Sequence, residues 1–168
     1  MALGLLIIRL AVGLTLAAHG AQKLFGLFGG HGLAGTGGFL ESLGFRPGKP
    51  LALLAGLGEL CGGLALALGV FTPFAAALVV ATMVVAMLGV HVEKGFFSQN
   101  GGYEYALLIA LSALGIAFAG PGALSLDAAF GLALAGTWWG GVALVMGVIG
   151  ALPPLLARAV ATRRRAST

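Results

Sequence analysis

Five long apolar runs dominate this sequence of 168 residues and limit the folds that are open to it. They are Leu3–Gln22, Leu51–Val70, Pro73–Val90, Tyr103–Ala119 and Trp138–Ala157. A helix needs about 20 apolar residues to cross the hydrocarbon core of a membrane. Only 8% of the residues are charged, against about 25% in soluble domains, so the chain cannot cover its surface with polar groups. The sequence therefore predicts an all-α integral membrane helical bundle.

The whole chain is expected to form a single transmembrane domain. It divides into a four-helix core over residues 3–130, an additional C-terminal span over residues 138–157 and a basic tail over residues 158–168. Two connections predict short apolar helices at the membrane surface or tucked into the bundle. In "TGGFLESLG", Thr36 is expected to cap the helix and Gly44 to end it. In "SLDAAFGLALAG", Ser125 or Asp127 is the expected cap.

Lysine and arginine predict the orientation, because the cytoplasmic loops of membrane proteins carry an excess of both. Eight of the nine fall on one side of a five-span topology. These are Lys23, Arg46, Lys49, Lys94, Arg158, Arg163, Arg164 and Arg165. That side is predicted to be cytoplasmic, with the N-terminus outside and the C-terminus inside. The first run has no basic residues before it and is expected to remain as a span rather than to be cleaved as a signal peptide.

The first run carries three basic residues on one face. At 100° per residue, Arg9, His19 and Lys23 fall within an arc of about 80°. A charge at the centre of a bilayer costs at least ~2.5–3.5 kcal/mol, so this face is expected to point into the bundle. We expect Arg9 to pair with Glu59 of the second run, with Asp127 as the competing partner. Such a pair would serve a ligand directly or only fix helix register.

A second group of ionisable residues is expected at the cytoplasmic ends of three runs. It consists of His19, Lys23, His91, Glu93 and Glu104. One hypothesis is a polar pocket that binds a head group or relays protons, with His19, His91 and Glu104 as its main members. The alternative is that Lys23, Glu93 and Lys94 are interfacial anchors.

Several kinds of chemistry have little or no support in the sequence. The single Cys61 excludes an intramolecular disulfide. The histidines and glutamates suit zinc, iron or haem by type, but no helix carries a ligand-spaced pair, so we assign no metal ligand. Phosphate-binding and nucleophile-elbow motifs are absent from the sequence. Because the basic residues sort by membrane side, the net charge of +4 gives no reason to expect nucleic acid.

Small residues inside the runs predict close helix packing. Gly58 with Gly62, and Gly136 with Gly140, form two GxxxG pairs. Packing inside one bundle is favoured over a face between copies in a homo-oligomer, since glycine is common throughout this chain.

Four stretches together resemble the DoxX family of bacterial and archaeal membrane proteins. They are "RLAVGLTLAAHGAQKLFG", "GLGELCGGLALALGVFTPFAA", "GFFSQNGGYEYALL" and "GPGALSLD", which cover about Arg9 to Asp127. The family is similar to the DoxD-type small subunit of thiosulfate:quinone oxidoreductase. The resemblance implies a four-helix core in the cell membrane, a quinone as ligand and soluble redox proteins as partners. It also implies that the family's polar positions are those of Arg9, His19, Lys23, Glu59, Glu104 and Asp127.

The leading hypothesis is a membrane subunit of a redox system that handles a quinone or another lipid-soluble ligand. In it, Glu59, His19 and Glu104 are the candidate catalytic residues that exchange protons. Arg9, Lys23, His91 and Asp127 are the candidate cofactor-binding residues. Two alternatives remain: a membrane scaffold that recruits soluble oxidoreductases through Phe39, Leu43, Phe96 and Phe97, and a small transporter. Nothing in the sequence indicates a flavin.

Overall fold

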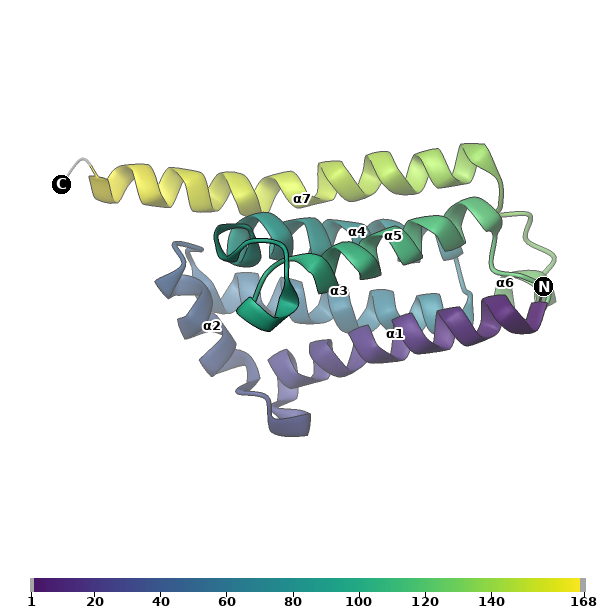
Figure 1. Cartoon of the computed structure of the whole chain (residues 1–168), viewed down its shortest axis with the longest axis horizontal. Helices are drawn as coiled ribbons and strands as arrows, with labels where there is room; N and C mark the ends of the chain where they lie inside the picture. The colour runs from purple at the N-terminus through teal and green to yellow at the C-terminus, as the bar shows by residue number, and fades with distance from the viewer. Residues whose placement is uncertain (1, 167–168) are drawn as a thin grey trace.

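Five long helices form the bundle in a computed structural model, which describes residues 2–166, with side-chain burial described for residues 2–163. The α-helices are α1 (Ala2–Phe25), α2 (Gly32–Ser42), α3 (Gly48–Leu68), α4 (Thr72–Ala86), α5 (Glu104–Ala119), α6 (Leu126–Ala129) and α7 (Thr137–Ala166). The short turns are η1 (Leu27–Gly29), η2 (Met87–His91), η3 (Val92–Lys94) and η4 (Ser98–Asn100). Figure 1 shows α1, α3, α4, α5 and α7 running side by side along the long axis, with α2 inclined at one end.

Four helical segments in the described part of the chain are long and apolar enough to cross a membrane. They are Ala2–Phe25, Gly48–Leu68, Thr72–Lys94 and Thr137–Arg163. The remaining expected span is a shorter apolar helix, Glu104–Ala119, whose 16 residues rise about 24 Å. It packs against α4 and α7 inside the bundle. The all-α membrane architecture expected from the sequence is therefore confirmed, with four candidate spans and one shorter apolar helix.

Helices α1 and α3 pack with their backbones in close contact. A Cβ atom built on Gly13 would lie 2.4 Å from the Gly63 carbonyl oxygen, and one on Gly20 would lie 2.5 Å from the Leu60 backbone nitrogen. No side chain fits at either position, so glycine sets the distance between the two helices. The contacts also fix an antiparallel register in which Gly13 faces Gly63.

The GxxxG pairs also pack inside the bundle. A Cβ atom on Gly58 would lie 2.7 Å from the Thr82 hydroxyl of α4, and one on Gly62 would lie 3.3 Å from Leu78. A Cβ atom on Gly140 of α7 would lie 2.3 Å from the ring of Phe118 in α5. Close packing within one chain, the favoured interpretation, accounts for these three glycines.

Aliphatic side chains face outward along the bundle as well as inward. The inner cluster joins α1, α3, α4, α5 and α7 through residues such as Leu16, Leu66 and Val79. Outside it, Ile7 of α1, Leu108 of α5 and Leu156 of α7 are each about 60% exposed, at 58%, 64% and 61%. Large exposed aliphatic side chains on every outer helix match a lipid environment.

The two short connecting helices are present, but only one is capped as expected. Helix α2 begins at Gly32, so Thr36 lies inside it and donates a 3.5 Å hydrogen bond to the Lys23 carbonyl oxygen. The expectation that Thr36 caps this helix was wrong. Gly44 follows the helix end with a φ of +89°, which glycine adopts without strain. Ser125 does cap α6, since its Oγ accepts a 3.2 Å hydrogen bond from the Ala128 N–H.

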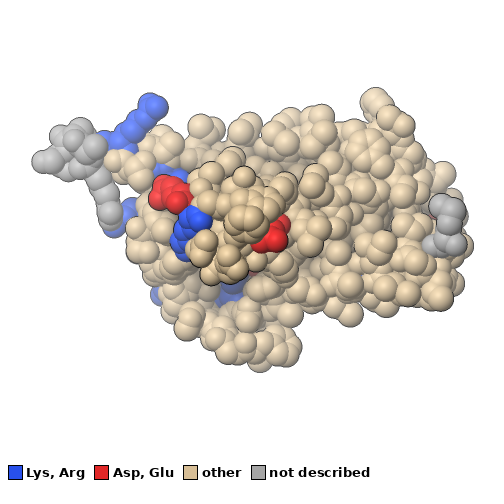
Figure 2. All heavy atoms as spheres, in the orientation of Figure 1, with Lys and Arg blue, Asp and Glu red and all other residues tan. Residues whose placement is uncertain are grey.

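Basic residues gather at one end of the molecule. Figure 2 shows Lys and Arg side chains over the end where α2 and the C-terminal part of α7 lie, and none at the opposite end of this face. Arg158 joins α7 to this end, because its guanidinium donates to the carbonyl oxygens of Leu43 at 2.9 Å and Leu88 at 3.4 Å. The lysine and arginine residues that were predicted to share one side of the membrane thus lie toward one end of the bundle, as far as their side chains are described. The side chains of Arg164 and Arg165, and residues 167–168, lie outside the described residues.

Candidate functional site: a cavity at the basic end of the bundle

A cavity of about 370 Å³ opens between α2, α3, α4 and α7 near the basic end. Its wall is mostly apolar. The polar residues that line it are Lys23, Thr36, Glu59, Thr82, His91 and Lys94. Among its apolar lining residues, Phe39 and Leu54 are 50% and 56% exposed, so the cavity opens toward the surface that lipid would cover. An apolar cleft with a few polar groups is the usual form of a small-molecule site.

Glu59 is the buried charge of this cavity. It lies in the middle of α3, is 2% exposed and forms an ion pair with the Lys23 ammonium through Oε1. Its second oxygen, Oε2, is buried and has no hydrogen-bond partner among the described residues. An unpartnered carboxylate oxygen inside a protein is costly. Glu59 therefore lines the cavity while one of its buried carboxylate oxygens keeps unused acceptor capacity.

The prediction that Arg9 pairs with Glu59 was wrong. The register between α1 and α3 explains why. Gly13 faces Gly63 while Gly20 faces Leu60 and the Gly56 carbonyl. Glu59 thus lies level with the second half of α1, near Lys23 and far from Arg9. Helix α1 continues to Phe25, beyond the predicted end at Gln22, which keeps Lys23 on the helix and in reach of the carboxylate.

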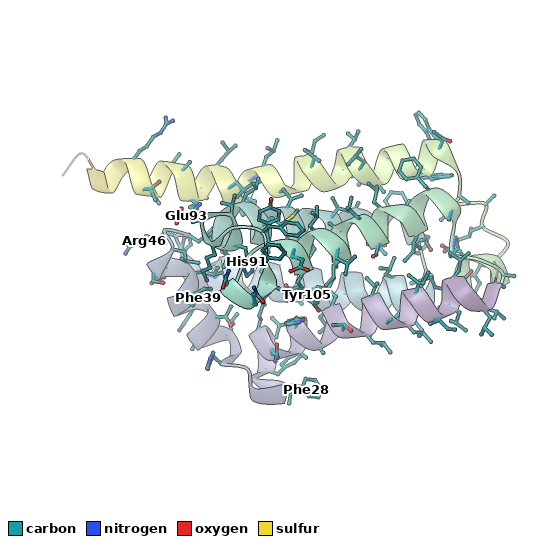
Figure 3. All side chains as sticks on the ribbon, in the orientation of Figure 1. Phe28, Phe39, Arg46, His91, Glu93 and Tyr105 are labelled. Carbon is teal, nitrogen blue, oxygen red and sulfur yellow. The ribbon has the colours of Figure 1, made fainter. Side chains whose placement is uncertain are left out.

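His91 reaches the cavity from a π-helical turn at the end of α4. The turn spans Met87–His91, and such turns often occur at functional sites. The Nδ1–H of His91 donates a 2.7 Å hydrogen bond to the Gly101 carbonyl oxygen. In a neutral ring, this bond selects the tautomer in which Nε2 is an acceptor. Figure 3 shows His91 near Phe39, at the same end of the bundle as Glu93 and Arg46.

The cavity wall on α7 is formed at a pair of prolines. Pro153 and Pro154 lie inside the helix, and Gly150 and Pro154 line the cavity. Because Pro154 has no N–H, the carbonyl oxygen of Gly150 lacks its usual helical donor. At membrane depth, such a group is tolerated where it lines a cavity or meets another partner.

The five ionisable residues expected at this end do not form one cluster. Lys23 and His91 line the cavity with Glu59. The Glu104 carboxylate instead accepts a 2.9 Å hydrogen bond from the Ser98 N–H, which closes the loop before α5. Glu93 lies 3.8 Å from Arg158 with its side chain 84% exposed, as expected of a residue at the interface.

His19 contacts a residue that the sequence analysis did not single out. Its Nε2 lies 3.3 Å from the Tyr105 hydroxyl, and the two rings are 5.7 Å apart between centroids. This pair joins α1 to α5 and is not part of the cavity lining. Tyr105 follows Glu104 directly in the sequence, so its position at the start of an apolar helix was the available signal. Thr36 and Thr82 were also missed as lining residues, because Thr36 was interpreted as a helix cap and a single threonine in an apolar run, as at Thr82, carries no distinctive pattern.

Arg9 and Asp127 lie at the opposite end of the bundle and bind the backbone. The Arg9 guanidinium, 1% exposed, donates to the carbonyl oxygens of Leu124 at 2.7 Å, Ala67 at 3.4 Å and Pro121. The Asp127 carboxylate accepts from the N–H groups of Phe71 at 2.7 Å and Thr72 at 2.9 Å, and from the Thr72 hydroxyl. No ion pair joins Arg9 to Asp127 among the described residues. Arg9 thus joins α1 to the end of α3 and to the segment after α5, and Asp127 joins α6 to the turn between α3 and α4.

Metal ligands do not gather in the part of the chain that the structure describes. No group of three His, Cys, Asp or Glu side chains there is placed to hold an ion. Cys61 is exposed on the surface of α3.

The fold and the cavity define a multi-pass helical membrane protein with a mostly apolar cleft near one end. The sequence profile of the DoxX family matches residues 4–92, more than half of the chain, and the protein belongs to this family. The match covers α1 to α4 and ends before "GFFSQNGGYEYALL" and "GPGALSLD".

A curated relative extends the similarity. It is an uncharacterized protein of Haemophilus influenzae, 34% identical over 130 residues, which cover 73% of this chain and 87% of the relative. No solved structure matches the chain.

Proposed function

We propose that this protein binds a lipid-soluble amphiphile of the quinone class in the cavity between α2, α3, α4 and α7. The observation that carries the proposal is Glu59, which lines a mostly apolar cavity of about 370 Å³ and whose buried Oε2 has no hydrogen-bond partner among the described residues. A ring with polar substituents would meet Glu59 and Lys23, while its apolar tail would leave past Phe39 and Leu54 toward lipid.

The proposed role is that of a membrane subunit in a redox system. A bound quinone accepts electrons and protons when it is reduced. The buried Glu59 carboxylate and His91, which line the same cavity, would exchange those protons. The proposed orientation places the cavity end in the cytoplasm, where soluble redox proteins would meet it. Arg9 and Asp127 would serve the architecture in this proposal, because their polar atoms face backbone groups at the other end.

A cavity-filling variant tests the proposal directly. Ala55 of α3 lines the cavity, so Ala55→Phe is expected to fill it. We expect the affinity of purified protein in nanodiscs for a short-tailed quinone and its quinol to fall at least tenfold, as measured by equilibrium dialysis. The matched control is Ala11→Phe, an exposed position on α1, where affinity should stay unchanged.

Two outcomes would contradict the proposal. One is an equal affinity of the wild-type protein and the Ala55→Phe variant for both ligand forms. The other is the absence of saturable binding to the wild-type protein, together with no quinone in solvent extracts of protein purified from its membrane. The scaffold hypothesis, in which exposed Phe96 and Phe97 contact soluble partners, predicts that second result.

A further inference from the structure

The hydroxyl groups in the cavity wall already donate their hydrogen atoms to the protein. Thr82 donates a 2.8 Å hydrogen bond to the Leu78 carbonyl oxygen, and Thr36 donates to the Lys23 carbonyl oxygen at 3.5 Å. A hydroxyl that donates to the backbone has only acceptor capacity left for a ligand. Neither threonine can therefore offer a hydrogen to a ligand without losing its present bond.

The other uncharged groups of the wall accept as well. His91 uses Nδ1–H toward Gly101, so the other nitrogen of a neutral ring accepts. Gly150 lines the cavity, and its carbonyl oxygen has no N–H from Pro154 to accept. Glu59 Oε2 adds the strongest acceptor, a buried carboxylate oxygen without a partner among the described residues. Among the lining side chains, the hydrogen-bond donors left for a ligand belong to the ammonium groups of Lys23 and Lys94. The Lys23 ammonium is already paired with Glu59.

The charges of the lining disfavour a cationic head group. Lys23 and Lys94 carry two positive charges, and Glu59 carries the single negative charge. A positively charged head would meet a site that already has a net positive charge, with its carboxylate neutralised by Lys23. A neutral head that donates hydrogen bonds satisfies Glu59 Oε2 without adding charge.

We infer that the cavity selects its ligand by hydrogen-bond direction, and that it prefers a neutral, hydroxyl-bearing head to one that only accepts. For the ligand class of the proposed function, on which this inference rests, the preferred form is the quinol. A quinone offers only carbonyl acceptors and would leave Glu59 Oε2 without a donor. A quinol offers two hydroxyl donors on a ring of nearly the same size.

The test compares two ligands that differ only in redox state. Decylubiquinol and decylubiquinone share the ring substituents and the tail. We expect the wild-type protein in nanodiscs to bind the quinol roughly ten- to hundredfold more tightly, the range for one hydrogen bond to a charged group. The dissociation constants are measured by equilibrium dialysis, with reductant added for the quinol.

Glu59→Gln separates hydrogen-bond direction from shape. The amide of glutamine can donate to a quinone carbonyl, so the preference for the quinol should disappear or reverse. Glu93→Gln removes an exposed carboxylate that does not line the cavity and should keep the wild-type preference. The dimethyl ether of the quinol tests the same point on wild-type protein, where folding of a variant plays no part; it should bind no better than the quinone.

The outcomes distinguish this inference from the proposed function. Equal binding of both forms, tighter binding of the quinone, or quinol preference retained by the ether or by Glu59→Gln would overturn the inference and leave quinone-class binding in place. Absence of saturable binding of every form would overturn the proposed function itself.

Discussion

Glu59 shows how one buried carboxylate ties stability to the candidate site. Its ion pair with Lys23 joins α3 to α1. Glu59 also lines the cavity, and its buried Oε2 has no partner among the described residues. Removing one partner of a buried pair leaves an uncompensated charge, which is more damaging than removing both. The pair and the free oxygen can therefore be tested separately.

Lys23→Met is expected to destabilise the protein by about 2–4 kcal/mol. This lies below the ~3–5 kcal/mol typical of fully buried pairs because the Lys23 side chain is 31% exposed. Unfolding in detergent, followed by circular dichroism, measures the loss. The double variant Lys23→Met with Glu59→Gln should regain most of it. If the double variant is as unstable as the sum of the single changes, the two residues do not interact as argued.

Arg9→Met is expected to cost about 3 kcal/mol or more, because three backbone carbonyl groups lose their donor. Arg9→Lys should be intermediate, since a single ammonium cannot reproduce the geometry of the guanidinium. Ligand affinity of the folded variants should match the wild-type value, because Arg9 lies at the end opposite the cavity. Arg163→Met, an exposed position on α7, is the control for stability. A selective loss of affinity in Arg9→Lys would instead support a ligand-binding role for Arg9.

The sequence predicted which residues are buried and charged, but not their partners. The periodicity of α1 placed Arg9, His19 and Lys23 on one face, and Arg9 is buried as expected. Their partners depend on the register between α1 and α3, which backbone contacts at Gly13 and Gly20 determine. Depths counted from the predicted helix ends could not supply that register. Backbone carbonyl groups as partners of Arg9 carry no side-chain pattern at all.

At the scale of elements, the π-helical turn η2 places two lining residues, Val90 and His91, at the cavity. It also brings Gly89 against Phe45, which lines the same cavity from the connection between α2 and α3. A Cβ atom on Gly89 would lie 2.4 Å from the ring of Phe45. A side chain at position 89 would therefore push against one residue of the cavity wall.

Gly89→Ala is expected to destabilise the protein by about 1–3 kcal/mol through overpacking. It should also weaken quinol binding, because Phe45 must move at the cavity wall. The matched control is Gly115→Ala in α5, where a Cβ atom would have nothing within 4 Å and helix propensity favours alanine by up to about 1 kcal/mol. Thermal unfolding and equilibrium dialysis on both variants decide the matter. Equal behaviour of the two alanine variants would refute the steric argument.

The helices could be predicted from the sequence where the residues are strongly hydrophobic. The positions at which helices begin and end were harder to predict. The apolar runs gave all five long helices, and the glycine at position 44 gave the end of α2. The start of α2 was missed because no cap side chain marks Gly32. The π-helical turn was missed because no residue pattern in Met87–His91 marks it, and the packing of Gly89 against Phe45 joins residues that are far apart in the sequence.

At the scale of the whole molecule, charge is distributed along the bundle axis. Basic residues other than the buried Arg9 lie toward the end that carries α2 and the C-terminal part of α7 (Figure 2). Four candidate spans would leave the termini on the same side, but α1 begins at one end of the bundle and α7 finishes at the other (Figure 1). Helix α5 therefore completes the crossing within the bundle, although it is shorter than each of the four candidate spans.

A C-terminal fusion tests the predicted orientation. The excess of lysine and arginine predicts a cytoplasmic C-terminus, so a fused fluorescent protein that folds only in the cytoplasm should fluoresce. Alkaline phosphatase fused at the same place should be inactive, and fused ahead of α1 behind a secretion signal it should be active. The reverse pattern would place the cavity at the outer side of the membrane.

The contacts of Arg9 also have a consequence for the order in which the chain assembles. The guanidinium enters the membrane with the first helix, yet two of its acceptors, Pro121 and Leu124, lie 112 and 115 residues further along the chain. Until α5 and the segment after it have been synthesised, α1 carries a charge without its full set of partners in lipid. The N-terminal helix is thus synthesised first, but its hydrogen bonds are among the last to form. In a chain interrupted before Pro121, the Arg9 guanidinium would lack two of its acceptors while the chain is still at the translocation machinery.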